Sequence, residues 1–231
     1  MSSLEPSVLT FDCFGTLIDW ELGILAALQP LLRARSIMLT NEDVLETFAR
    51  LEAKAEAGPY LSYRAVLGQV VDGLGEQLGF TATQAERDQL AESVPSWPPF
   101  PDTAAGLRAL KTRFGLGVIT NCDTDLFLAA ARQFPISFDA VITAEEVRSY
   151  KPSTRNFEVA LERLNVPRER ILHVAQSLYH DIAPARSLGL TTVWVNRRSS
   201  LAGGGATPPS DATPDYEVPD LHSLVELLGL L

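Results

Sequence analysis

Asp12 directly follows a short apolar run, and its carboxylate is the first group in the chain that could do chemistry. The run Val8–Phe11 is rich in β-forming residues, which predicts a buried strand. Because an unpaired carboxylate is costly inside a strand, we expect Asp12 at its carboxyl end, facing a crevice. Gly15 and Thr16 can then turn the backbone and present N–H groups and a hydroxyl to whatever Asp12 contacts. Asp12 alone is equally compatible with an ordinary polar turn after a strand.

Polar residues follow other apolar runs of the chain in the same way. They are Thr120, Asn121, Lys151, Gln176, Ser177 and Asp181. In open α/β sheets the carboxyl ends of the strands form the edge at which ligands bind, so these side chains should converge. A carboxylate that attacks, a hydroxyl and amides that hold a negative group, and an ammonium that offsets clustered charge suit nucleophilic displacement on an anionic substrate.

After residue 97 the sequence alternates between helix and strand patterns, as a sheet that positions such residues requires. Helices are expected at 102–113, 123–133, 154–164 and 181–188, and strands at 116–120, 140–143, 171–175 and 191–195. The segment 199–214 is rich in Gly, Pro, Ser and Ala and reads as an exposed loop, followed by a short strand at 216–218 and a small helix at 220–230. Apolar runs separated by helices predict a parallel sheet covered on both faces.

The segment from residue 20 to residue 97 has helical patterns only. Four helices are expected there, with Thr40 or Asn41 capping the second and Thr83 the fourth. Four prolines between residues 95 and 101 then mark a hinge. We therefore predict an α/β core made of residues 1–19 and 98–231, with residues 20–97 inserted as a helical lid over the crevice beside Asp12.

Composition limits the class of partner and the location of the protein. The 231 residues are 46% hydrophobic and 21% charged, which is typical of a globular protein, and the net charge of −10 disfavours nucleic acid or an anionic membrane as partner. A small anionic substrate remains compatible with a local basic group. With two cysteines, a non-basic N-terminus and no apolar run of about 20 residues, we expect a cytoplasmic protein.

Four ordered segments carry a specific resemblance. The sequences FDCFGTLID, VITN, SYKPS and HVAQSLYHD resemble the four motifs of the haloacid dehalogenase superfamily, and the helical insertion after the first resembles its cap domain. The resemblance implies a Rossmann-like parallel sheet with an inserted α-helical cap. By analogy with superfamily dehalogenases, it also implies a homodimer.

The resemblance also implies a role for each motif residue. Asp12 would be the nucleophile that forms a covalent ester, supported by Thr16, and Lys151 would pair with Asp12 and keep it ionised. Asp181 would orient water or a metal. The remaining motif positions, among them the backbone amides after Asp12, would bind the substrate's anionic group or leaving group: Cys13, Phe14, Thr120, Asn121, Gln176 and Ser177.

Two departures from the superfamily's phosphatases favour its 2-haloacid dehalogenase branch. Phosphatases carry a general-acid aspartate two residues after the nucleophile, where this chain has Phe14, and a halide needs no proton to leave. Their last motif holds Mg²⁺ with an acidic pair, whose first member is here Gln176. We therefore expect dehalogenation of a small 2-haloacid without a cofactor. The alternative is a Mg²⁺-dependent phosphatase that holds the metal through Asp12, the Phe14 backbone and Asp181.

A second alternative is a catalytically silent binding protein, which retention of the costly cluster Asp12, Lys151 and Asp181 disfavours. Dehalogenases of this branch place a cap arginine near the halide, and Arg50 and Arg64 are the candidates here. His173 reads as a core histidine and His180 as a residue near the site. Trp20, Tyr60 and Tyr63 could line a pocket under the cap, although aromatic residues more often pack helices.

Overall fold

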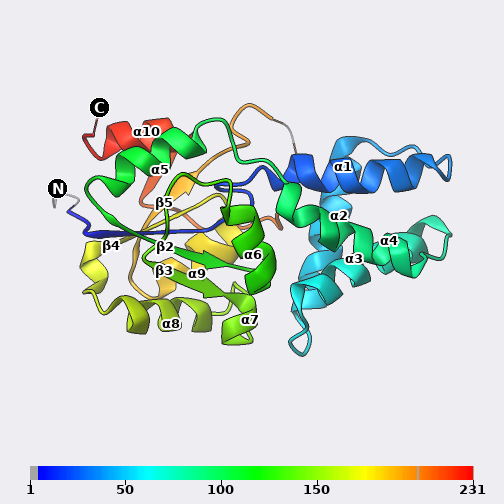
Figure 1. Ribbon diagram of the computed structural model, residues 1–231, viewed down its shortest axis with the longest axis horizontal. Coiled ribbons are helices and arrows are strands. Elements are labelled where there is room, and N and C mark those ends of the chain that lie inside the picture. Colours follow the sequence, from blue (N-terminus) through cyan, green and yellow to red (C-terminus); the bar gives the residue numbers. More distant parts are fainter. Residues whose placement is uncertain (1–4, 202, 231) are drawn as a thin grey trace.

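A six-stranded parallel sheet forms the centre of the computed structural model, which describes residues 5–201 and 203–230 (Figure 1). The strands are β1 (Val8–Phe11), β2 (Gly115–Thr120), β3 (Ala140–Thr143), β4 (Ile171–Ala175), β5 (Thr191–Val195) and β6 (Tyr216–Val218), in the order β3-β2-β1-β4-β5-β6. Every neighbouring pair is parallel. The predicted α/β fold is confirmed, and β1 lies at the middle of the sheet, so Asp12 follows a central strand.

Helices cover both faces of the sheet. They are α5 (Thr103–Lys111), α6 (Thr124–Ala131), α7 (Ala144–Val147), α8 (Arg155–Leu164), α9 (Ala183–Ser187) and α10 (Leu221–Leu227). Side chains of α8 and α9 pack with Ile119 and Ile142, whereas those of α5, α6 and α10 pack with Leu116 and Val118 from the opposite face. Figure 1 shows α5 and α10 above the sheet and α8 below it. The alternating contacts of β2 explain its continuous apolar run.

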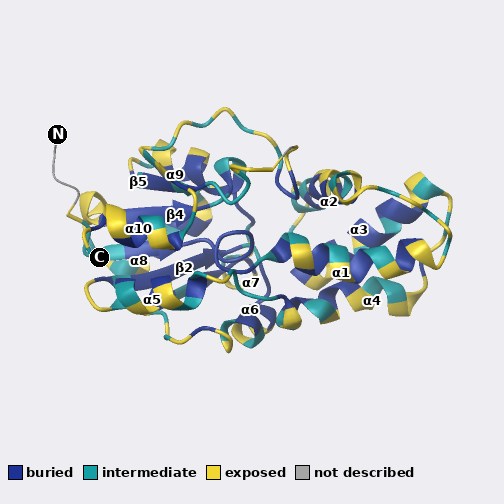
Figure 2. Ribbon diagram, turned by 90° about the horizontal axis from the view of Figure 1, so that it is seen from above, coloured by how far each residue is buried: buried dark blue, intermediate teal, exposed yellow. Residues whose placement is uncertain are grey.

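The helical insertion (residues 20–97) contains α1 (Trp20–Arg33), α2 (Asn41–Glu56), α3 (Tyr63–Leu78) and α4 (Gln84–Ser93), followed by a 3₁₀ turn at Val94–Ser96. It lies beside the sheet as a separate group of helices (Figure 1). Side-chain oxygens of Thr40 and Thr83 cap α2 and α4 in capping boxes, as expected from the sequence. Buried residues lie mainly in the sheet and on the inner faces of these helices (Figure 2). The domain boundaries at 19/20 and 97/98 stay a prediction.

The turn after β1 brings three elements together. The amides of Leu17 and Ile18 both donate to the carbonyl of Cys13, which closes the turn tightly. Gly15 has a φ of 93°, and a Cβ at this position would lie 2.9 Å from Nε1 of Trp20 and 3.1 Å from Oε1 of Gln176. Only glycine fits this conformation and this close approach. The turn therefore joins the end of β1 to the start of α1 and the end of β4.

The composition of the long loop between β5 and β6 predicted that it is exposed, but part of this loop is buried. Gly205, Ala206 and Thr207 are buried against the helical insertion. The amides of Gly205 and Ala206 donate to Glu42 and Glu21, respectively, at 2.9 Å each. Its small residues pack closely because these carboxylates approach the backbone directly. We call residues 196–201 and 203–215 the strap, since they connect the sheet to α1 and α2.

In the part of the chain that the structure describes, no helix combines the length and apolar character required to cross a bilayer. The cytoplasmic location stays a prediction.

Candidate active site

Lys151 lies at the centre of a buried ion network beyond the carboxyl ends of the strands. Its Nζ lies 2.8 Å from Oδ1 of Asp12 and 2.7 Å from Oδ1 of Asp181. It also donates to the carbonyl of Ile119 at 2.9 Å. Asp12 follows β1, Asp181 lies in the π turn Leu178–Ile182 after β4, and Lys151 lies between α7 and α8. The structure thus brings together three residues that are up to 169 positions apart in the sequence.

The second carboxylate oxygen of Asp12 is held by Thr16. The Thr16 hydroxyl donates to Oδ2 of Asp12 at 2.7 Å, and the same hydroxyl oxygen accepts the amide of Gln176 at 2.9 Å. Because a hydroxyl has only one proton to donate, the Gln176 amide fixes the direction of the Thr16 bond. Asp12 is therefore oriented through both of its oxygens.

Burial and charge compete at the two carboxylates. Burial raises the pKa of Asp12 above its ordinary value, and the Asp181 charge adds to this, although Lys151 and Thr16 oppose the rise. Burial also disfavours the Asp181 charge, but Lys151 and His173 outweigh it and lower the pKa. The two carboxylates in turn raise the pKa of Lys151 despite its burial. Lys151 favours an ionised Asp12, as expected, but the net shift for Asp12 is upward.

His173 connects the network to the sheet. Its Nε2 lies 3.1 Å from Oδ1 of Asp181, and its Nδ1 lies 2.9 Å from the hydroxyl of Thr10. The side chain is completely buried, as predicted for a core histidine. A neutral imidazole ring carries one N–H. If Nε2 carries it and donates to Asp181, Nδ1 accepts a hydrogen bond from the Thr10 hydroxyl. His173 therefore positions Asp181 and lies away from the space in front of Asp12.

Asn121 braces the segment that carries Lys151. Its Oδ1 accepts the Lys151 amide at 2.7 Å, and its Nδ2 donates to the Lys151 carbonyl at 3.0 Å. Nδ2 also lies 3.3 Å from Oε2 of Glu56. The neighbouring Thr120 is buried, and its hydroxyl oxygen has no hydrogen-bond partner among the described residues. Of the two strand-end residues, Thr120 is the one with a free polar group.

A small cavity of about 30 Å³ lies in front of Asp12, between the sheet edge and the helical insertion. The cavity wall on the sheet side, the core wall, is formed by Asp12, Phe14, Thr120, Asn121, Lys151, Gln176, Ser177, His180 and Asp181. Every motif residue with a predicted polar role except Thr16 and Cys13 lines it. Thr16 lies behind Asp12, and Cys13 is buried outside the cavity wall.

The opposite wall contains residues that the motifs did not indicate. This cap wall is formed by Trp20, Glu52, Glu56 and Tyr63 from α1, α2 and α3, with Thr207 from the strap. Glu52 and Glu56 lie four residues apart, so both carboxyls project from one side of α2. Trp20 and Tyr63 line the cavity, as considered from the sequence, whereas Tyr60 does not. The sequence did not indicate that the two glutamates belong to the site, because a glutamate in a helix is ordinarily exposed to solvent.

The two arginines considered for the halide lie elsewhere. Arg50 donates to Gln77 at 2.8 Å in an exposed pair, and Arg64 pairs with Asp125 on the surface. Neither residue lines the cavity. The expectation of a cap arginine at the site, based on Arg50 or Arg64, is therefore wrong.

The donor set does not suit Mg²⁺. Asp12 and Asp181 share the ammonium of Lys151, and Gln176 offers an amide oxygen that accepts the Thr207 hydroxyl at 3.2 Å. Within residues 5–201 and 203–230, no group of three or more His, Cys, Asp or Glu side chains could hold a metal ion. A hard cation prefers several anionic oxygens that are free to bind it, and this set of side chains does not provide them.

Comparison with known proteins places this arrangement in a family context. Residues 6–189 match the model of a family described as haloacid dehalogenase-like hydrolase. An (S)-2-haloacid dehalogenase from Pseudomonas fluorescens is 27% identical over 242 residues, covering 97% of this chain and 96% of its own. Haloacetate dehalogenase H-2 from Moraxella sp. (strain B) is 27% identical over 184 residues, covering 74% and 80%.

A solved structure and a more distant enzyme complete the comparison. The crystal structure of the L-2-haloacid dehalogenase PA0810 superposes with a TM-score of 0.78 at 25% identity, covering 97% of this chain and 100% of the other. The pyrimidine 5'-nucleotidase YjjG from Escherichia coli (strain K12) is 30% identical, but over only 56% of each chain. The Pseudomonas fluorescens protein and PA0810, which both match over nearly the full length of this chain, are named as dehalogenases.

Proposed function

The chain belongs to the haloacid dehalogenase-like hydrolase family, and we propose that it hydrolyses the carbon–halogen bond of a small 2-haloacid through an ester of Asp12. The observation that carries this proposal is the pairing of Asp12 with Phe14 on one cavity wall. Asp12 supplies an oriented nucleophile, and Phe14 stands where a phosphatase needs an acid. A halide leaves as a stable anion, so a site without that acid suits carbon–halogen cleavage.

The first half of the reaction is displacement at carbon. A carboxylate oxygen of Asp12 forms a bond to the carbon that bears the halogen, and the halide leaves with the bonding electrons. Lys151 and Thr16 hold the carboxylate at 2.8 and 2.7 Å, which keeps it facing the cavity. Orienting the nucleophile before reaction lowers the entropic part of the barrier.

The second half is hydrolysis of the ester. Water adds to the side-chain carbonyl carbon of Asp12, and the 2-hydroxyacid departs as Asp12 is regenerated. Asp181 lines the cavity, and its Oδ2 is buried without a hydrogen-bond partner among the described residues. An ionised carboxylate oxygen in this position accepts a hydrogen bond from the attacking water. Lys151 stabilises the negative charge that develops on Asp12.

Halide release tests the proposal. The purified protein should release halide from chloroacetate, fluoroacetate or 2-chloropropionate in the presence of EDTA, and Asp12→Asn should reduce the rate at least ~10³-fold. A single turnover in H₂¹⁸O should place the label in Asp12, measured by mass spectrometry. Phosphate release from phosphate esters that EDTA abolishes, without halide release, would instead support the phosphatase reading. Inactivity in both assays together with binding of a metabolite would support a silent binding protein.

A further inference from the structure

The cap wall of the cavity holds two buried carboxyl groups without a cation of their own. Glu52 is 2% exposed, and its Oε1 accepts the hydroxyl of Tyr63 at 2.7 Å. The Glu56 side chain is 6% exposed, and its Oε2 accepts Nδ2 of Asn121 at 3.3 Å. Oε1 of Glu56 is buried and has no hydrogen-bond partner among the described residues. A polar atom of this kind needs a ligand or a proton to offset its desolvation.

The one lysine in the cavity wall has no donor left for a substrate. An ammonium group has three N–H donors. Those of Lys151 are directed at Asp12, Asp181 and the Ile119 carbonyl. No arginine is among the residues that line the cavity in the described chain. The carboxylate of a 2-haloacid therefore meets no unengaged cation in this site, and neutral donors must hold it.

Two further residues that line the cavity carry a buried polar atom without a hydrogen-bond partner in the described part of the chain: the Thr120 hydroxyl oxygen and Nε2 of His180. The Ser177 hydroxyl oxygen accepts the His180 amide at 2.8 Å, which leaves its proton for Nδ1 of His180 at 3.2 Å. Nδ1 then accepts, so Nε2 carries the ring proton. Burial lowers the pKa of His180 to about 4, so the ring is neutral at physiological pH.

We propose that Glu56 acts as a neutral carboxylic acid and donates a hydrogen bond to the substrate's carboxylate, together with Nε2–H of His180 and the Thr120 hydroxyl. The inference rests on the proposed function, because it names what holds the acid group of the molecule that Asp12 attacks. Nε2 of His180 lies 4.0 Å from Oε2 of Glu56, so both donors approach the cavity from adjacent positions.

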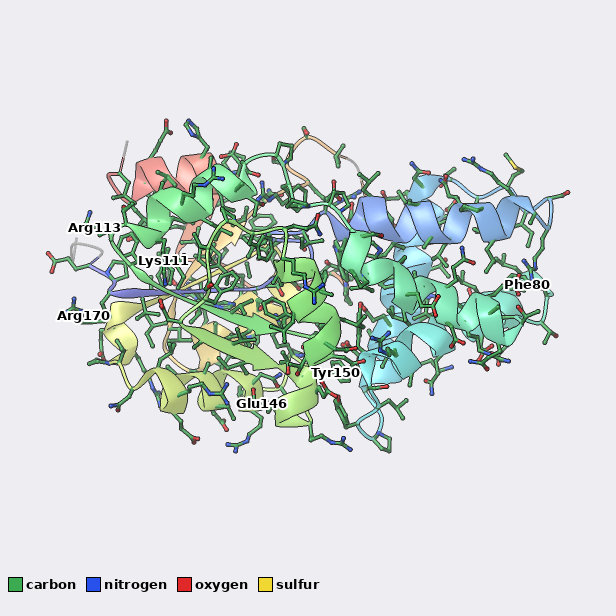
Figure 3. The ribbon with its side chains drawn as sticks, viewed as in Figure 1. Phe80, Lys111, Arg113, Glu146, Tyr150 and Arg170 are labelled. Carbon is green, nitrogen blue, oxygen red and sulfur yellow. The ribbon has the colours of Figure 1, made fainter. Side chains whose placement is uncertain are left out.

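The protonated form of Glu56 follows from its surroundings. Burial raises the pKa of Glu56 well above its ordinary value, and the Glu52 charge raises it further. Lys151 and Asn121 act in the opposite direction. The other titratable groups that face this carboxyl are His180, which is neutral, and Tyr150 and Tyr63, whose pKa values are raised by burial and by Glu56. Figure 3 shows Tyr150 where the core meets the helical insertion. An incoming carboxylate adds negative charge and favours the proton on Glu56 still more.

This arrangement predicts a specific pH dependence for substrate binding. Substrate needs the protonated form, so KM should rise about tenfold per pH unit above the pKa of Glu56 in the free enzyme. The chemical step at Asp12 does not use this proton, so kcat should not fall in the same range. A merely structural role for Glu56 would change stability or kcat and would not produce this selective rise in KM.

Glu56→Gln provides the decisive variant, because its amide supplies an N–H donor at every pH. We expect its KM for 2-chloropropionate to stay constant from pH 6 to pH 10, whereas KM of the wild type rises. Glu56→Ala should raise KM at least tenfold at every pH. Glu46→Gln, an exposed substitution on the same helix, is the matched control and should behave as the wild type.

Two results of this kinetic comparison would overturn the proposal. A wild-type pH profile of KM retained in Glu56→Gln would show that another group titrates. A tenfold weaker binding by Glu56→Gln at pH 6 would show that a hydrogen-bond donor at this position does not hold the substrate's carboxylate.

Calorimetric binding of lactate distinguishes this inference from the proposed function, since it needs no turnover. Lactate affinity that falls with pH in the wild type, but not in Glu56→Gln, supports the donor role even without halide release. Absence of lactate binding to the wild type at pH 6 would overturn it.

Discussion

The two walls of the cavity accommodate buried carboxyl groups in opposite ways. On the core wall, Asp12 and Asp181 share the ammonium of Lys151 at 2.8 and 2.7 Å, so charge is balanced by charge. On the cap wall, Glu52 and Glu56 have hydroxyl and amide donors but, among the residues that the structure describes, no ammonium or guanidinium within hydrogen-bond distance. Burial raises the pKa of both glutamates, which favours neutral acids there.

The charge states of the two walls match two different requirements of the proposed reaction. In the proposed reaction, nucleophilic attack needs an ionised carboxylate, and Lys151 favours that form of Asp12 against the effect of burial. Holding an anionic substrate needs donors, and a neutral acid is a donor where a carboxylate would repel. If both proposals hold, one cavity uses the same functional group in two protonation states, set by the partners that each wall provides.

Removing the lysine should have the largest effect of any change to either wall. Lys151→Met leaves two buried carboxylates without their counter-ion, which we expect to lower the free energy of unfolding by about 3–5 kcal/mol. Halide release should fall at least ~10³-fold. Urea unfolding at pH 7 measures the first effect. The matched control is Lys111→Met, whose exposed partner Asp139 makes a pair worth less than about 1 kcal/mol. Equal losses in both variants would contradict the balance proposed for the core wall.

The buried carboxyl group of Glu52 on the cap wall should make the free energy of unfolding depend on pH. Burial raises the pKa of Glu52 from 4.5 to about 8. The folded protein therefore binds a proton that the unfolded chain releases. This contribution is complete below pH 4.5 and is lost as pH rises toward 8, at up to about 1.4 kcal/mol per pH unit. Asp181, with its lowered pKa, has the opposite sign, and its contribution is lost as pH falls below the ordinary value of 3.8.

Glu52→Gln isolates that contribution. The amide keeps the size of the side chain and can still accept the Tyr63 hydroxyl, but it cannot titrate. We expect the variant to gain stability relative to the wild type between pH 5 and pH 8, measured by urea unfolding at both values. Glu46→Gln is exposed and should leave the pH dependence as in the wild type. A wild-type slope in Glu52→Gln would mean that Glu52 is ionised in the folded state.

The sequence indicates the core wall much better than the cap wall. Asp12, Lys151 and Asp181 follow strands or lie shortly beyond them, and parallel strands bring their carboxyl ends to one edge regardless of separation along the chain. Glu52 and Glu56 lie on a helix whose apolar residues account for its packing, so nothing in the local pattern marks them as buried. Only the position of α2 opposite the sheet edge makes them part of the site.

The contacts of the strap could not be predicted from the sequence either. Its Gly- and Pro-rich composition predicts a loop, and the structure has one, but composition does not reveal what the loop contacts. Gly205 and Ala206 present backbone amides to carboxylates of α2 and α1, which are distant in sequence. Contacts of this type depend on tertiary placement rather than on local propensity.

Two adjacent arginines at the start of the strap serve the two walls separately. Arg197 donates to the Thr16 carbonyl at 2.8 Å and pairs with Asp102, so it supports the turn that orients Asp12. Arg198 pairs with Glu21 and Glu42, so it connects the strap to α1 and α2. Because Glu21 and Glu42 belong to the helical insertion, the contribution of these two ion pairs should concern the cap wall.

Arg198→Gln should therefore have the smallest effect, a rise in KM of roughly threefold with kcat unchanged, since partly exposed ion pairs contribute at most about 1 kcal/mol. Arg197→Gln is its matched comparison and should lower kcat instead, because the Thr16 bond to Asp12 is a contact of the core wall. Steady-state halide release separates the two parameters. If both variants changed kcat and KM in the same proportion, the strap would act on the cavity as a unit, and the two walls would not be independent.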